Sequence, residues 1–231
     1  DNGVGNTITI DTDIPDGNWG DTYIFGDDAL DLFDVDAVGI GNGNTITAGG
    51  SSAVDVDNAN GSITIEGNDG TLGALTGTLN IVADDDGQST GDTLVVNTGE
   101  NDTTIDAADA DDTVDIDAEA MADTTTLTLS GAAAMDVDNA NASITIDASS
   151  TLSGELVITS DADTVTGSGG DTLVVNTGTS NTTINAADAD DLVDIDAAVL
   201  ADGQTLTLNG AADMDVDNAN ASITIDASST L

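Results

Sequence analysis

An unchanged internal repeat constrains this chain more than any other feature of its sequence. The segment from Met135 to Leu152 recurs residue for residue from Met214 to Leu231, and a looser copy runs from Val54 to Glu66. Self-similarity of this kind is typical of repeat proteins, in which each unit packs mainly against its neighbours. We therefore expect one structural unit present three times.

The repeat is longer than this segment. Residues 92–152 align without gaps to residues 171–231, at an offset of 79. In the diverged first copy, Phe33–Ala37 aligns to the second copy at an offset of 81, but Asp21–Phe25 aligns best to residues 92–96, at an offset of 71. The two offsets predict a first copy that lacks ten residues, about half of a solenoid coil.

These alignments divide the chain into three parts of one continuous solenoid. The expected parts are residues 1–72, a diverged and shortened first repeat with an aromatic N-terminal region, residues 73–152, the second repeat, and residues 153–231, the third. The chain begins with Asp1 and not with Met, so we expect a processed piece of a longer protein.

Short alternating segments such as Val193–Asp196 and Thr205–Leu208 recur through each copy. Alternation with period two indicates β-strands, and the Gly, Asn, Asp, Ser and Ala between them are turn residues. No segment has a sustained helical period, so the fold is expected to be all-β. A parallel β-solenoid with coils of about twenty residues fits this spacing, and tandem β-sandwich repeats are the alternative. Very short strands, small aliphatic interior residues and the lack of a large aromatic in each copy favour the solenoid.

The charge is extreme. The chain has 45 acidic residues and no lysine, arginine or histidine, which gives a formal net charge of −45. Two carboxylates on adjacent strands, about 4.8 Å apart, repel by roughly 1 kcal/mol even in water. We therefore expect the fold to need external cations. Nucleic acid and anionic membrane surfaces are poor partners because both bind positive charge, and no apolar run predicts membrane insertion.

Acidic turns are the first candidate cation sites. One turn, residues 107–112, recurs at 186–191. Its carboxylates are Asp109, Asp111 and Asp112 in the second copy and Asp188, Asp190 and Asp191 in the third. Hard divalent cations bind six to eight such oxygens, so these turns predict several Ca²⁺ ions per chain. The alternative is a solvated acidic turn.

Acidic strands are the second candidate. If the aliphatic residues of these strands point inward, their aspartates point outward, and a solenoid stacks them in columns. The residues concerned are Asp34, Asp36, Asp55, Asp57, Asp115, Asp117, Asp136, Asp138, Asp194, Asp196, Asp215 and Asp217. Either cations lie between the stacked carboxylates, or the face is solvated and prevents sideways aggregation.

Three short segments resemble degenerate pieces of the RTX calcium-binding nonapeptide: Gly167–Leu173, Gly91–Leu94 and Gly20–Tyr23. In a wider sense, the acidic, cysteine-free repeats resemble those of bacterial S-layer proteins and large adhesins. The resemblance implies an exported, calcium-ordered structural protein at the cell surface. It covers about a tenth of the chain, and the tandem glycine pairs of RTX repeats are missing.

Catalysis is poorly supported by this composition, because general acid–base chemistry most often uses His, and anion stabilisation uses Lys, Arg or a metal. We therefore expect no enzyme, although two carboxylates can suffice for a glycosidase. The leading hypothesis is a secreted, calcium-stabilised solenoid that associates with itself, end to end or laterally, into an extracellular filament or surface layer. The alternatives are a spacer or binding section of a calcium-dependent adhesin, with a cell-surface polysaccharide as a candidate partner, and a halophile's acidic surface.

Overall fold

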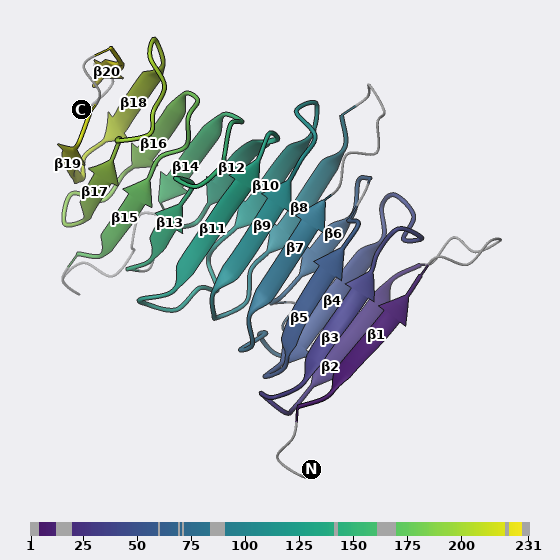
Figure 1. Ribbon diagram of the computed structural model, residues 1–231. Coiled ribbons are helices and arrows are strands. Elements are labelled where there is room, and N and C mark those ends of the chain that lie inside the picture. Colours follow the sequence, from purple (N-terminus) through teal and green to yellow (C-terminus); the bar gives the residue numbers. More distant parts are fainter. Residues whose placement is uncertain are drawn as a thin grey trace.

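The chain forms a rod of two parallel β-sheets, seen in a computed structural model (Figure 1). The structure describes residues 5–12, 20–59, 61–68, 70, 72–83, 91–140, 143–160, 170–219 and 222–227. Each sheet contains ten strands in this part of the chain, and successive strands alternate between the two sheets. The fold is therefore a β-solenoid, as the sequence predicts, and not a row of sandwiches.

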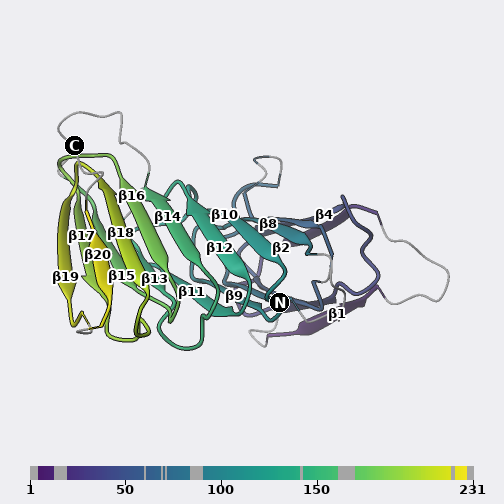
Figure 2. The ribbon, with the colours of Figure 1, turned by 90° about the horizontal axis from the view of Figure 1, so that it is seen from above.

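The first sheet contains the odd-numbered strands: β1 (Thr7–Asp11), β3 (Leu32–Asp36), β5 (Ala53–Asp57), β7 (Leu79–Ala83), β9 (Thr103–Ala107), β11 (Thr126–Gly131), β13 (Thr145–Asp147), β15 (Thr172–Asn176), β17 (Leu192–Asp196) and β19 (Asp213–Asp217). The second sheet contains the even-numbered strands: β2 (Thr22–Gly26), β4 (Thr45–Gly50), β6 (Thr64–Glu66), β8 (Thr93–Asn97), β10 (Thr113–Asp117), β12 (Ala134–Asp138), β14 (Leu156–Ser160), β16 (Thr182–Ala186), β18 (Thr205–Gly210) and β20 (Thr224–Asp226). Figure 2 shows the two sheets as the two layers of the rod.

Alternating side chains build the interior. In β10, Val114 and Ile116 are 1% and 0% exposed, whereas Thr113 and Asp115, which alternate with them, face solvent. Successive side chains of a strand point to opposite faces of the sheet, so one apolar residue in two fills the narrow space between the layers. Each fully buried Val, Ile or Leu contributes roughly 1.5–3 kcal/mol. No described segment is a helix, and none is therefore long and apolar enough to cross a membrane.

The coils are longer and less regular than the sequence predicts. Leu127 pairs with Ile146, 19 residues further along the chain, and Ile146 pairs with Val175, 29 residues further. The two spacings differ because the turns differ in length, whereas the paired strands keep their register. The expected solenoid with two strands in each coil is therefore confirmed, and its coils vary in length around and above the expected twenty residues.

Glycine closes one corner of each repeat. Gly50, Gly131 and Gly210 end β4, β11 and β18 with positive φ angles of 94°, 106° and 113°. A Cβ atom on Gly131 would meet the carbonyl group of Ala107 in the preceding coil. Only glycine combines this left-handed conformation with so close an approach between coils.

Corresponding strands of successive repeats are seven strands apart in the described chain. β8–β13 recur as β15–β20 at the offset of 79 found in the sequence. β2–β6 recur as β9–β13 at a single offset of 81, so the predicted deletion of ten residues is not observed. The alignment of Asp21–Phe25 with residues 92–96 is wrong, because β2 corresponds to β9 and not to β8.

Shared hydrogen bonds establish this correspondence. The Asp21 carboxylate accepts a bond from the Thr45 amide, as the Asp102 carboxylate does from Thr126. Thr22 pairs with Ile46 just as Thr103 pairs with Leu127. The offset between β2 and β9 is therefore 81, the same as for the rest of the first copy. The sequence alignment failed because the dipeptide Asp-Thr opens both β8 (Asp92–Thr93) and β9 (Asp102–Thr103). Alignment with β8 would place Tyr23, which faces solvent, at the position of the buried Leu94.

The aromatic residues of the first repeat lie in two environments. Phe33, on β3, is partly buried and packs against the core, as a larger core residue would. Tyr23 and Phe25, on β2, are 67% and 56% exposed and face away from the core. The fourth aromatic, Trp19, lies outside the described residues.

The unchanged repeat provides a matched test of core burial. Met135 is 1% exposed, whereas Met214, its counterpart in the third repeat, is followed by the same residues but is only partly buried. We expect Met135→Ala to lower the free energy of unfolding by about 2–5 kcal/mol, because it leaves a cavity between coils. Met214→Ala should lower the free energy of unfolding much less. Urea unfolding followed by circular dichroism measures both, and equal losses would contradict the burial pattern.

Candidate functional site

Outward-facing aspartates gather in three acid blocks, each formed by two paired strands. In register, Asp34 pairs with Asp55 and Asp36 with Asp57 on β3 and β5. The second block pairs Asp115 with Asp136 and Asp117 with Asp138 on β10 and β12; the third pairs Asp194 with Asp215 and Asp196 with Asp217 on β17 and β19. The predicted stacking of these aspartates on neighbouring coils is confirmed.

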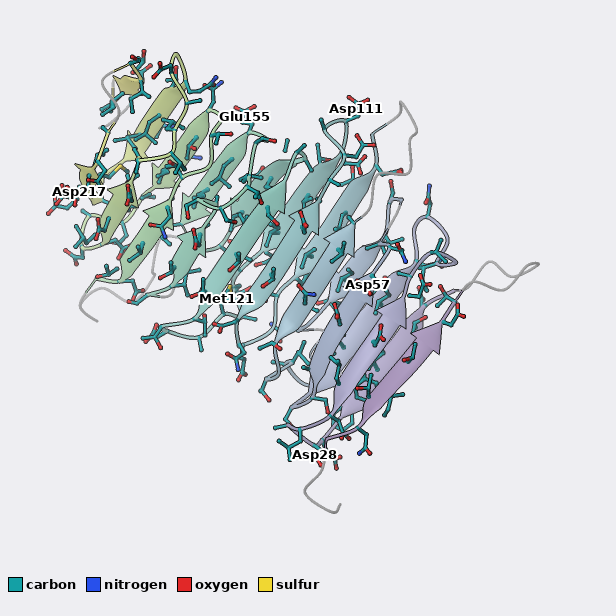
Figure 3. The ribbon with its side chains drawn as sticks, viewed as in Figure 1. Asp28, Asp57, Asp111, Met121, Glu155 and Asp217 are labelled. Atoms are coloured by element: carbon teal, nitrogen blue, oxygen red, sulfur yellow. The ribbon has the colours of Figure 1, made fainter. Side chains whose placement is uncertain are left out.

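The blocks alternate between the two faces of the rod. The first and third lie on the odd-numbered sheet and the second on the even-numbered sheet. This follows from the seven strands of the repeat, because an odd number of strands moves each motif to the opposite sheet. Asp57 and Asp217, labelled in Figure 3, mark the two blocks that share a sheet.

Two carboxyl groups in these blocks have raised pKa values. Burial raises the pKa of Asp57, and the charges of Asp55, Asp34 and Asp36 raise it further. Burial likewise raises the pKa of Asp136, with added contributions from Asp138 and Asp115. Burial and a neighbouring negative charge both disfavour ionisation, so these two carboxyl groups ionise less readily than a solvated aspartate.

The acidic turns between strands use their aspartates to fold the backbone. The Asp109 carboxylate accepts a hydrogen bond of 2.9 Å from the Asp111 amide, and the Asp188 carboxylate accepts one of 3.0 Å from the Asp190 amide. The Leu30 amide donates to Asp28 in the same way in the first repeat. These are Asx turns, in which a short carboxylate replaces a backbone acceptor.

The third aspartate of each turn joins neighbouring coils. The Asp112 carboxylate accepts a hydrogen bond of 2.8 Å from the Asp92 amide, and the Asp191 carboxylate accepts one of 3.0 Å from the Asp171 amide. Asp112 and Asp191 are therefore held by the fold. Within the described chain, no hydrogen bond reaches the carboxylates of Asp111 or Asp190, which face solvent.

An asparagine ladder after the acidic strands is a feature that the sequence reasoning missed. Asn58 and Asn139 have positive φ angles of 55° and 57°. Their amide groups donate to the carboxylates of Asp36 and Asp117 in the preceding coil, at 3.0 and 3.1 Å. Asparagine is one of the few residues that favour this left-handed conformation. The recurring Asp-Val-Asp-Asn motif is the signal that predicts such a turn.

A small polar hollow lies beside the second acid block. It has a volume of about 120 Å³ and is lined by Glu66, Asn97, Asp117 and Glu119, among others. The Asn97 amide group donates to Glu66 at 2.6 Å. The equivalent hollow of the third repeat has a volume of about 310 Å³ and is lined by Asn176, Asp196 and Ala198, among others.

Ala198 takes the position of Glu119 in this second hollow, as their matching turns show. The third repeat therefore does not reproduce the carboxylate set of the second. In the described residues, no three acidic side chains converge closely enough to hold a metal ion. The calcium sites at the turns and acid blocks therefore stay a prediction, and the structure assigns several of the named aspartates to backbone hydrogen bonds instead.

The turn geometry predicts opposite effects for two neighbouring aspartates. Asp109→Ala should destabilise the fold by about 1 kcal/mol, because it removes the acceptor of the Asx turn. Asp111→Ala removes an exposed negative charge and should be neutral or slightly stabilising. Thermal unfolding of both variants at one ionic strength tests this, and a larger loss for Asp111→Ala would contradict the turn assignment.

The acid blocks predict a pH effect with a definite sign. Because the pKa of Asp136 is raised in the fold, its contribution to stability is fully present below the ordinary value of 3.8 and is lost as the pH rises through the raised value. Asp136→Asn should therefore be more stable than the parent at pH 7, by less than about 1 kcal/mol because the side chain is solvated. This advantage should shrink as the pH falls toward the ordinary value. An advantage that grows on acidification would contradict the assignment.

Comparisons of the chain with protein-family models, with curated proteins and with solved structures find no match. The fold and the geometry described above therefore carry the functional argument by themselves.

Proposed function

We propose that this chain is a section of a secreted structural protein: a β-solenoid rod that calcium stabilises and that assembles into an extracellular filament or surface layer. The observation that supports it is the recurrence of the same acid block once in each repeat, on a continuous pair of sheets. Recurrence along a rod suits a material or a spacer, because each repeat then makes the same contacts.

Electrostatics supports the need for cations. Each acid block places four carboxylates on two adjacent strands, with about 4.8 Å between strands. Each adjacent pair costs roughly 1 kcal/mol in water. No basic side chain exists anywhere in the sequence to offset this cost. Cations near the blocks relieve the repulsion, and a divalent ion does so at lower concentration than a monovalent one.

Calcium is the favoured cation because every available ligand is an oxygen. Ca²⁺ accepts carboxylate, amide and backbone oxygens at flexible geometry, with water completing the set. The hollow beside Glu66, Asp117 and Glu119 offers carboxylate and amide oxygens together. Because no three acidic side chains of the described residues converge there, an ion in this hollow would take water as well as protein oxygens, as would ions between the stacked carboxylates of the acid blocks.

A spacer section of a large adhesin is the second candidate. Exposed aromatic residues occur on β2 of the first repeat, where the second repeat has polar residues on β9. A surface that differs in one repeat only favours an attachment point at one position of the rod, as a spacer with a single partner would need.

A cation titration tests the proposal. At low ionic strength with chelator, the chain should show reduced β-structure by circular dichroism, and millimolar calcium should restore it. Sodium chloride of equal ionic strength is the matched control, since it screens charge without binding. Electron microscopy of the same samples should show filaments or sheets with calcium that disperse on chelation. A chain that folds in concentrated monovalent salt and ignores calcium would contradict the proposal and support a halophilic surface.

A further inference from the structure

Four exposed positions of the first repeat carry large apolar side chains. Tyr23 and Phe25 lie on the outward face of β2 and are 67% and 56% exposed. Leu30 and Val38, 58% and 48% exposed, lie on the turns before and after β3. We call these four residues the apolar band. These are the four most exposed large apolar side chains among the described residues, on a surface that is otherwise acidic.

The other repeats have mostly polar residues at the same positions. The counterparts are Thr104, Asp106, Asp111 and Glu119 in the second repeat and Thr183, Asn185, Asp190 and Ala198 in the third. Matching hydrogen bonds define them: the Val38 amide donates to Asp36 as the Glu119 amide donates to Asp117. The fold therefore forms equally well with polar residues here, and packing does not account for the apolar band.

The two aromatic residues form a platform on the sheet. They are two residues apart on one face of β2, so their side chains are separated by roughly 7 Å along the strand. The neighbouring strand places Thr47 beside Tyr23 and Gly49 beside Phe25. Both of these neighbours are buried, and Leu72 and Gly73 cover Gly49. The two rings are nevertheless more than half exposed, which leaves them accessible to a flat ligand.

Charge restricts what this surface binds. An anionic polymer is repelled by a net charge of −45, whereas a second copy of this chain would associate through the acid blocks, where calcium relieves the repulsion, and not through uncharged positions. A cationic partner would bind the acid blocks, which all three repeats possess. At the apolar band it would find fewer negative charges, because Phe25 takes the place of Asp106 and Leu30 takes the place of Asp111. A neutral partner remains.

We propose that the apolar band binds a neutral polysaccharide, with sugar rings stacked on Tyr23 and Phe25; this rests on the proposed function as an extracellular structural protein. A pyranose ring presents C–H groups on its faces and hydroxyl donors at its rim. The C–H faces suit aromatic rings, and the hydroxyls suit a surface rich in acceptors and lacking charged donors. Asp21 and Asp27, exposed directly before and after β2, provide such acceptors. The first repeat thus attaches the rod at one position.

The repeat itself supplies the test variants. Tyr23→Thr with Phe25→Asp installs the residues of the second repeat, so the fold has a precedent for them. Thr183→Ala with Asn185→Asp, on β16 of the third repeat, is the matched control, because it also changes two outward-facing strand residues, here half-buried, and adds one negative charge. Affinity electrophoresis through gels containing soluble neutral glucan, mannan or galactan measures binding, with polygalacturonate as the anionic comparison.

We expect at least one neutral polysaccharide to retard the parent and the control variant, and polygalacturonate to retard neither. The Tyr23→Thr, Phe25→Asp variant should bind at least ten-fold more weakly, with an unchanged circular dichroism spectrum. Absence of retardation by every neutral polymer would overturn the proposal, as would equal retardation of both variants. A parent that dimerises through these residues, shown by sedimentation of the variant as monomer, would also overturn it in favour of a second copy.

Failure of this inference is separable from failure of the proposed function. Calcium-dependent folding and assembly are measured without polysaccharide, and polysaccharide binding is measured on chain already shown to be folded. A rod that assembles with calcium but binds no polysaccharide overturns only the inference. A rod that folds without calcium and binds polysaccharide overturns only the calcium-dependent assembly.

Discussion

The absence of positive charge is the constraint on which the rest of the structure depends. With no lysine, arginine or histidine, each of the 45 acidic side chains must find a backbone amide, a neutral side chain, water or an external cation. The fold uses the first solution wherever the chain turns: Asp109 holds its own turn and Asp112 holds the preceding coil. These carboxylates are then partly neutralised by N–H dipoles. In the acid blocks, Asp36 and Asp117 also accept such bonds, from the amides of Val38 and Glu119. Burial, together with neighbouring carboxylates, raises the pKa of Asp57 and of Asp136 in these blocks.

The sequence predicted the class of fold because its signals are local. Alternation in segments such as Val193–Asp196 reports the strand and its inward face, and the unchanged copies report the stacking. The paired aspartates of the acid blocks followed from the same two facts. Neither signal needs knowledge of contacts far away in the sequence, and so both survived comparison with the structure.

What the sequence did not predict depends on register and on turn length. The β2 segment resembles the start of β8 in its letters but takes the place of β9, and only the pairing of Thr22 with Ile46 decides between them. The roles of the turn aspartates could not be separated by composition either. In the sequence, Asp109, Asp111 and Asp112 look like three equivalent ligands. In the fold, Asp109 and Asp112 accept backbone hydrogen bonds and Asp111 faces solvent. A carboxylate committed to a backbone amide still has lone pairs, but its direction is fixed by the turn and not by an ion.

Because the number of strands in a repeat is odd, the number of repeats decides which sheet a following segment joins. Seven strands correspond to three and a half coils, so each added repeat carries whatever follows it to the other side of the rod. A protein that gains or loses one such unit would point its two ends the opposite way relative to each other, whereas a change of two units would preserve their alignment. Parity of repeat number, and not length alone, thus decides which way a distant part of the molecule faces.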